Sequence, residues 1–261
     1  LHDTNPAIFN FTFGNDGNEL VGNAYRALLY TLPAVAGLAG ATLRIPNSFM
    51  IAICGGRNVK FMTSLLLILP AIGTGMALQN PDTPFHIFII LAALSGVGGG
   101  AFASSMSNIS FFFPKKMQGL ALGLNAGLGN LGVAVMQLLV PFIITFAIFG
   151  GEPRLLGEQQ IWIHNAGFVW VPVLAFCAIL AFLFMNNMPQ HKCGAAPIAI
   201  GKYLWLELLG YGGAAVAILL LITPWGGFPV LLKIFVILVI AVLITLGLMR
   251  YLTPKETKDN L

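Results

Sequence analysis

The sequence predicts an all-α membrane protein, and three observations lead to this prediction. Of its 261 residues, 57% are hydrophobic and only 8% are charged. A soluble domain carries about 25% charged residues, because its surface must face water. The mean hydropathy is +0.87, and the apolar residues gather in seven runs that are long enough for a helix to cross a bilayer core about 30 Å thick.

Each apolar run is expected to form one membrane-spanning helix rather than a barrel strand, because runs of this length do not alternate with a period of two. The expected spans are approximately 24–54, 61–79, 87–112, 117–148, 164–186, 203–223 and 229–250. The segment 1–23 is then extracytoplasmic, 24–190 holds five of the helices, and 191–261 holds two more helices and a tail. The chain begins with a leucine and shows no signal peptide at its start, so we expect it to be a piece of a longer protein.

The lysines and arginines between the spans predict the orientation of the chain. Nine lie on the side that also holds the C-terminus: Arg57, Lys60, Lys115, Lys116, Lys192, Lys202, Arg250, Lys255 and Lys258. Three lie on the opposite side: Arg26, Arg154 and Lys233. The positive-inside rule therefore places the C-terminus in the cytoplasm, and the protein is expected in the inner membrane.

The composition also excludes several classes of protein. The net charge of +4 is spread thinly along the chain, so no nucleic-acid partner is expected. The three cysteines have no metal-ligand spacing and are too few for a disulfide scaffold. We expect no metal, no cofactor and no enzymatic activity, and the lipid bilayer is the expected environment.

Arg44 is the one charged residue expected deep inside a span. It lies thirteen residues before Arg57, which is about 20 Å along a helix and close to the middle of the bilayer. A central arginine costs about 2.5–3.5 kcal/mol on insertion scales. Since no acidic residue is expected at the same depth, its partner is predicted to be a soluble anion, and a planar guanidinium suits flat oxyanions. The competing interpretation is that Arg44 donates to backbone carbonyls beside Pro33 and Pro46 or reaches the interface.

Two other polar or aromatic residues are expected at the same depth as Arg44. Asn130 lies fourteen residues after Lys116, and Phe102 lies thirteen residues before Lys115. An amide can donate to a second anion oxygen, and a phenyl ring can wall a cavity. In isolation each residue would be interpreted as helix packing, but their shared level with Arg44 makes them candidate anion-binding residues.

Glycine is abundant in the third and fourth spans, where small residues allow helix backbones to approach closely. Gly119, Gly123 and Gly127 form a stripe at four-residue spacing in the fourth span. The third span carries Gly96, Gly98, Gly99 and Gly100. We therefore expect these two neighbouring helices to pack against each other.

Two other membrane-protein classes fit less well. A retinal protein would need Lys233 deeper in the last span and an acidic counter-ion in the third. A haem-carrying subunit would need paired histidines inside the bundle, whereas His86 and His164 lie at the outer ends of spans and His191 in a loop. Glu207, near the inner end of the sixth span, is expected to be solvated, although it is a possible proton relay.

Two stretches of the sequence closely resemble the nitrate/nitrite porters of the major facilitator superfamily (the NarK type). They are AGATLRIPNSFMIAICGGR at 39–57 and GGGAFASSMSNISFFFPKKMQGLALGLNAGLGNLGVAVMQ at 98–137. The run GLNAGLGNLG at 123–132 is similar to the nitrate signature helix of this family. The resemblance covers approximately 24–190. It implies a partial major-facilitator-type helical bundle, in which the first five spans correspond to helices two to six of a twelve-helix fold.

The resemblance also implies roles for particular residues. Arg44 falls on the nitrate-binding arginine of the family, Phe102 on its cavity phenylalanine and Asn130 on the signature asparagine. Asn125 and Gly129, in the same glycine-rich run, are further candidate binding residues. The resemblance implies nitrate and nitrite as substrates, carried by exchange or with protons, and a missing C-terminal half as the partner of this N-terminal part.

The chain departs from the family pattern at several points. The first helix and the second half of the family fold are absent, and the loop GGRNVK at 55–60 lacks the usual acidic residue. The spans at 203–250 resemble two extra helices that longer porters carry between their halves. Two alternatives stay open: a porter for another small anion such as a carboxylate, and a membrane subunit that does not transport.

Overall fold

The structure is a computed structural model that describes residues 23–80, 82–156, 158–188 and 193–254. The described chain contains α1 (Asn23–Cys54), α2 (Gly56–Gln79), α3 (Phe85–Phe112), α4 (Lys115–Ile143), β1 (Arg154–Leu156), β2 (Gln159–Ile161), α5 (Asn165–Phe168), α6 (Trp170–Phe184), α7 (Ala196–Ile222) and α8 (Val230–Leu252). Seven helical segments of this part are long and apolar enough to cross a membrane, with α5 and α6 forming one of them. This agrees with the all-α membrane fold that the sequence predicts.

Some helices begin or end at other residues than expected. The second helix begins at Gly56 rather than 61, because Gly55 takes a φ of +84° and turns the chain directly from α1 into α2. The fourth ends at Ile143 rather than 148, where the amide of Asn165 donates to the carbonyls of Ile143 and Phe146. The sixth begins at Ala196, with Pro197 in its first turn, where proline is favoured. The antiparallel pair β1–β2, which joins Arg154 to Ile161, was not expected.

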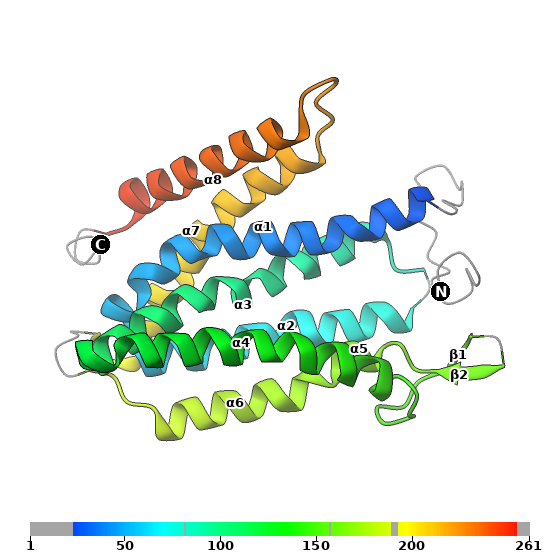
Figure 1. Ribbon diagram of the computed structural model, residues 1–261, viewed down its shortest axis with the longest axis horizontal. Coiled ribbons are helices and arrows are strands. Elements are labelled where there is room, and N and C mark those ends of the chain that lie inside the picture. The colour runs from blue at the N-terminus through cyan, green and yellow to red at the C-terminus, as the bar shows by residue number, and fades with distance from the viewer. Residues whose placement is uncertain (1–22, 81, 157, 189–192, 255–261) are drawn as a thin grey trace.

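The helices lie roughly side by side, with α1 in contact with both α3 and α7 (Figure 1). α2 contacts α3 and α6, and α8 lies against α7. The largest buried cluster, with Met50, Tyr203, Leu206 and Met249 among its members, joins α1, α7 and α8 near one end. Helices α7 and α8 therefore both contribute residues to the buried core of the bundle.

Helix α4 differs from the others, because none of its residues is buried. It contacts the described chain mainly through α3 and α5. Gly119, Gly123 and Gly127 have open space around the position where a Cβ would stand. The stripe of small residues on α4 therefore faces no described helix.

Helices α3 and α4 are in contact, as expected, but this contact does not run through their glycines. Three of the four α3 glycines face α1: for example, a Cβ added at Gly96 would lie 2.6 Å from the Cβ of Ala39, and one added at Gly100 would lie 2.7 Å from the Cβ of Leu43. The physical reason is that small residues permit close approach to whichever helix is adjacent, and α1 holds the complementary small residues. These glycines of α3 therefore pack against α1, although α4 is the helix that follows α3 in the sequence.

The ends of the helices agree with the alternation that the charges predict. The α1–α2 and α3–α4 connections and the last turn of α8 lie at one end of the bundle, and the β1–β2 pair lies at the other (Figure 1). Several basic residues expected between the spans lie inside helices, among them Arg57 and Lys60 of α2 and Lys202 of α7, and Lys60 is half-buried. Its ammonium donates to Ala101 O, Ser104 Oγ and Ser105 Oγ of α3 at 3.0, 3.1 and 2.6 Å.

Candidate functional site

Arg44 lies in α1 between the two prolines of that helix, Pro33 and Pro46. Its side chain is exposed, whereas Leu43 before it and Asn47 one turn later are buried. One face of α1 is thus packed into the bundle, and Arg44 projects from another face. Among the described residues no carboxylate forms an ion pair with it.

Helix α3 supplies the surroundings of the guanidinium. Arg44 Nε donates to the carbonyl of Gly99 at 3.3 Å, and its Cζ lies 5.4 Å from the centroid of the Phe102 ring. This contact has the geometry of a cation–π interaction, which is worth about 0.5–1 kcal/mol at an exposed site. The structure therefore brings together two of the predicted site residues, Arg44 and Phe102.

The bond to Gly99 agrees in part with the competing interpretation of Arg44, since one of its five N–H groups is satisfied by a backbone carbonyl. The remaining four donors are on the terminal nitrogens, and these make no hydrogen bond to the part of the chain that is described. They form the planar fork that recognises carboxylate-like oxyanions. The Nε bond fixes the plane of the group and leaves the fork open.

The other three candidate residues lie on α4. Asn125 is half-buried, and its amide donates to the sulfur of Met106 at 3.5 Å, which is a weak acceptor. Gly129 and Asn130 are both exposed, and a Cβ at Gly129 would meet nothing within 4 Å. No hydrogen bond joins them to Arg44 within the described chain, so their place in the site stays a prediction.

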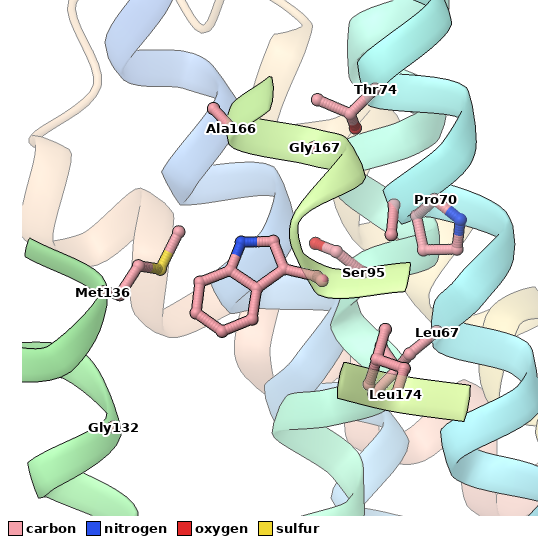
Figure 2. A pocket seen from close by; sticks show the side chains of 11 residues that line it. Leu67, Pro70, Thr74, Ser95, Gly132, Met136, Ala166, Gly167 and Leu174 are labelled. Carbon is pink, nitrogen blue, oxygen red and sulfur yellow. The ribbon is translucent and has the colours of Figure 1, made fainter. Parts of the chain in front are cut away.

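A cavity of about 420 Å³ lies between α4 and the helices α2, α3, α5 and α6. In Figure 2, Met136 and Gly132 of α4 lie on one side and Pro70 and Thr74 of α2 on the other, with Ala166 and Gly167 of α5 between them. Its lining holds no charged side chain and includes Leu67, Ser95 and Leu174. Such a wall does not neutralise an anion, so this cavity and the Arg44 site are different places.

The environments of two polar residues, the half-buried Lys60 and the buried Glu207, differ from those that the sequence predicts. Lys60 was counted as a loop residue, although the serine pair that holds it, Ser104 and Ser105, is visible in the third span. Glu207 was expected to be solvated, but it is only 2% exposed and accepts a hydrogen bond from Asn47 Nδ2 at 2.8 Å. Helix α7 begins earlier than hydropathy suggests, so Glu207 lies eleven residues after its start and well inside the helix. This position is the signal that the sequence offers for the burial of Glu207.

A bundle of long apolar helices, with an arginine that has no acidic partner among the described residues, defines the class: a multi-pass helical membrane protein. Comparison with known proteins specifies it further. The chain is 47% identical over 191 residues to the nitrate/nitrite transporter NarU of Escherichia coli (strain K12), which covers 70% of this chain and 41% of that transporter. It is 45% identical over 191 residues to NarU of Salmonella typhimurium, with the same coverage of 70% and 41%.

A third relative is the probable nitrate/nitrite antiporter NarK2 of Thermus thermophilus, with 44% identity over 169 residues, 62% of this chain and 38% of that protein. No family model matches the chain. The resemblance to NarK-type nitrate/nitrite porters is thereby confirmed, and the chain is a relative of these porters. The matched part spans about two fifths of the length of each of these three relatives.

Proposed function

We propose that this chain is part of a secondary transporter for nitrate and nitrite, and that Arg44 binds the anion. The observation that carries the proposal is the open fork of Arg44, which has no acidic partner among the described residues and is held in plane by Gly99. The names of the relatives, nitrate/nitrite transporter and antiporter, supply the substrate class. A flat anion with three oxygens suits a bidentate guanidinium.

The other candidate residues have distinct roles in this proposal. Phe102 walls the site and holds the guanidinium by its ring face. Asn130 orients the anion through its amide, with Asn125 and Gly129 beside it on α4. Because α4 has no buried residue in the described chain, its placement against Arg44 depends on the covering it receives in the complete protein.

Transport by such a protein requires more than the described helices. Alternating access needs two bundles that move around a central site. The chain matches only about two fifths of its relatives, which supports an arrangement in which 24–190 contributes one bundle, 191–261 adds two helices, and a C-terminal half supplies the rest. Both anion exchange and proton-coupled uptake are compatible with this arrangement.

The proposal is tested by measuring transport by the full-length protein that carries the substitution Arg44→Lys. Lysine keeps the charge but lacks the planar fork, so we expect a large loss of nitrate and nitrite uptake into membrane vesicles. Arg250→Lys is the matched control, because Arg250 is exposed in the last turn of α8 and its replacement leaves uptake unchanged. Undiminished uptake by Arg44→Lys removes Arg44 from the mechanism, and stronger competition by a carboxylate than by nitrite assigns the site to another anion.

A further inference from the structure

The α1–α7 interface contains a buried carboxyl group next to the helix turn that carries Arg44. Glu207 of α7 is 2% exposed, and its Oε1 accepts from Nδ2 of Asn47 at 2.8 Å. The same Asn47 nitrogen donates to Leu43 O at 3.0 Å. Since Asn47 lies three residues after Arg44, this bond joins α7 to α1 beside the proposed anion site.

Glu207 Oε2 and Asn47 Oδ1 are both buried acceptors without a hydrogen bond of standard length and angle. Tyr203, four residues before Glu207 on α7, interacts with the carboxyl group as a hydrogen-bond partner of looser geometry. An ionised carboxylate in such a place needs a cation, because burying a bare charge costs several kcal/mol. Glu207 forms no ion pair with the described residues. A neutral carboxylic acid removes the charge and converts one carboxyl oxygen from acceptor to donor.

The charged and titratable groups around Glu207 do not supply the missing cation. Tyr203 of α7 is a hydrogen-bond partner of the carboxyl group, and Glu207 acts electrostatically on Tyr203, Tyr211 and Cys54, none of which carries a positive charge. On α2 the neighbouring group is Thr63, whose hydroxyl is 3.0 Å from that of Tyr203.

The lysines and arginines of the helices that pack around Glu207 are engaged or exposed elsewhere. Arg57 of α2 lies over the Phe182 ring, Lys60 of α2 is bonded to α3, and Arg250 of α8 is exposed. Lys202 of α7 acts on Cys54 and Cys193, and its five-residue offset from Glu207 is a rotation of about 140° around the helix.

We propose that Glu207 is a proton-binding site, held as a neutral acid between α1 and α7, and that its proton controls the contact of α7 with the turn around Arg44. The step is an exchange of one proton with water and makes or breaks no other bond. Gly210, one turn after Glu207, packs on the same turn: a Cβ there would lie 2.7 Å from Leu43 Cδ2 and 2.9 Å from Pro46 Cγ. A change of charge at Glu207 therefore acts on the residues that flank Arg44. This coupling, but not the proton site, rests on the proposed function.

The test is infrared difference spectroscopy of the complete protein in lipid. The carbonyl stretching band of a protonated carboxylic acid reports Glu207 directly and needs no transport. We expect this band at neutral pH, its loss on alkaline titration, and its absence in Glu207→Gln, whose amide keeps an acceptor for Asn47. Glu152→Gln is the matched control, because Glu152 is exposed and its removal leaves the band unchanged.

A second variant keeps the assignment testable if Glu207→Gln does not fold. In Asn47→Ala the carboxyl loses its hydrogen-bond donor, so the band moves to higher frequency. An identical band in Glu207→Gln, a band that does not move in Asn47→Ala, or no protonated-acid band in the unmodified protein overturns the proton site.

Addition of nitrate tests the coupling separately. A nitrate-induced change of the Glu207 band that disappears in Arg44→Lys supports the coupling. Nitrate binding without any change of the band overturns the coupling and leaves the proton site standing. Absence of nitrate binding contradicts the proposed function, whereas the pH titration still decides the protonation of Glu207.

Discussion

Gly40 of α1 and Gly99 of α3 face each other backbone to backbone. A Cβ added at Gly40 would lie 3.2 Å from Gly99 Cα, and one added at Gly99 would lie 3.0 Å from Gly40 Cα. Arg44 follows Gly40 by about one helical turn, and Phe102 follows Gly99 by three residues. The glycine contact therefore sets the separation across which Arg44 reaches Gly99 O and the Phe102 ring.

Gly99→Ala is expected to lower the thermal stability of the solubilised protein and to weaken nitrate binding. The added methyl group meets backbone atoms of α1, which cannot turn aside as a flexible side chain would. The control is Gly119→Ala on α4, where nothing lies within 4 Å. We expect no loss of melting temperature there, because alanine is the better helix former. Equal effects of the two substitutions would show that the α1–α3 approach is not tight.

The ammonium of Lys60 is held by α3, and Ser105 provides the shortest of its hydrogen bonds at 2.6 Å. Ser105→Ala is expected to destabilise the protein by about 1.5–3 kcal/mol, the range for a hydrogen bond to a charged group. Ser110→Ala on the same helix is the control, since that hydroxyl is exposed and bonds only within its own helix, to Met106 O. Melting temperatures in detergent measure both, and an unchanged value for Ser105→Ala would contradict the Lys60 contact.

Cys193, in the connection between α6 and α7, is buried against the cluster that includes Cys54 and Tyr203. Burial raises the pKa of the Cys193 thiol, and the positive charge of Lys202 lowers it in part. Because the folded protein disfavours the thiolate, the contribution of this group to stability is lost as the pH rises through the ordinary thiol range, about 8.5. We expect alkylation of Cys193, followed by mass spectrometry, to reach half its maximal rate above that pH.

The charge of Lys202 provides the check on this prediction. Lys202→Met is expected to raise the midpoint of Cys193 alkylation further, because the lowering influence is removed. Lys116→Met, an exposed residue of α4, leaves the midpoint unchanged. A midpoint that falls in Lys202→Met contradicts the proposed electrostatics.

Hydropathy predicts the number of spans well, because each run is long enough to need burial in lipid. It places their ends less well where polar residues stay helical. Arg57 and Asn58 interrupt the apolar run, yet α2 already includes them, since Gly55 permits the sharp turn before it. The β1–β2 pair has strands of three residues each, too short for a period-two pattern to be recognised.

The sequence also predicts some residues of the candidate site better than others. The depth argument placed Arg44 and Phe102 at one level, and they are in contact. The same argument could not say which face of α4 carries Asn130, because residue counting gives height along a helix and not direction around it. It also could not show that Glu207 is buried, since that depends on the packing of α7 against α1.

The bond between Asn47 and Glu207 spans 160 residues of sequence. A ribosome adds about 5–20 residues per second, so α1 enters the membrane about 8–32 s before α7 is synthesised. During that interval the Asn47 side chain lacks its partner on α7, and the turn around Arg44 is completed only when the sixth span arrives.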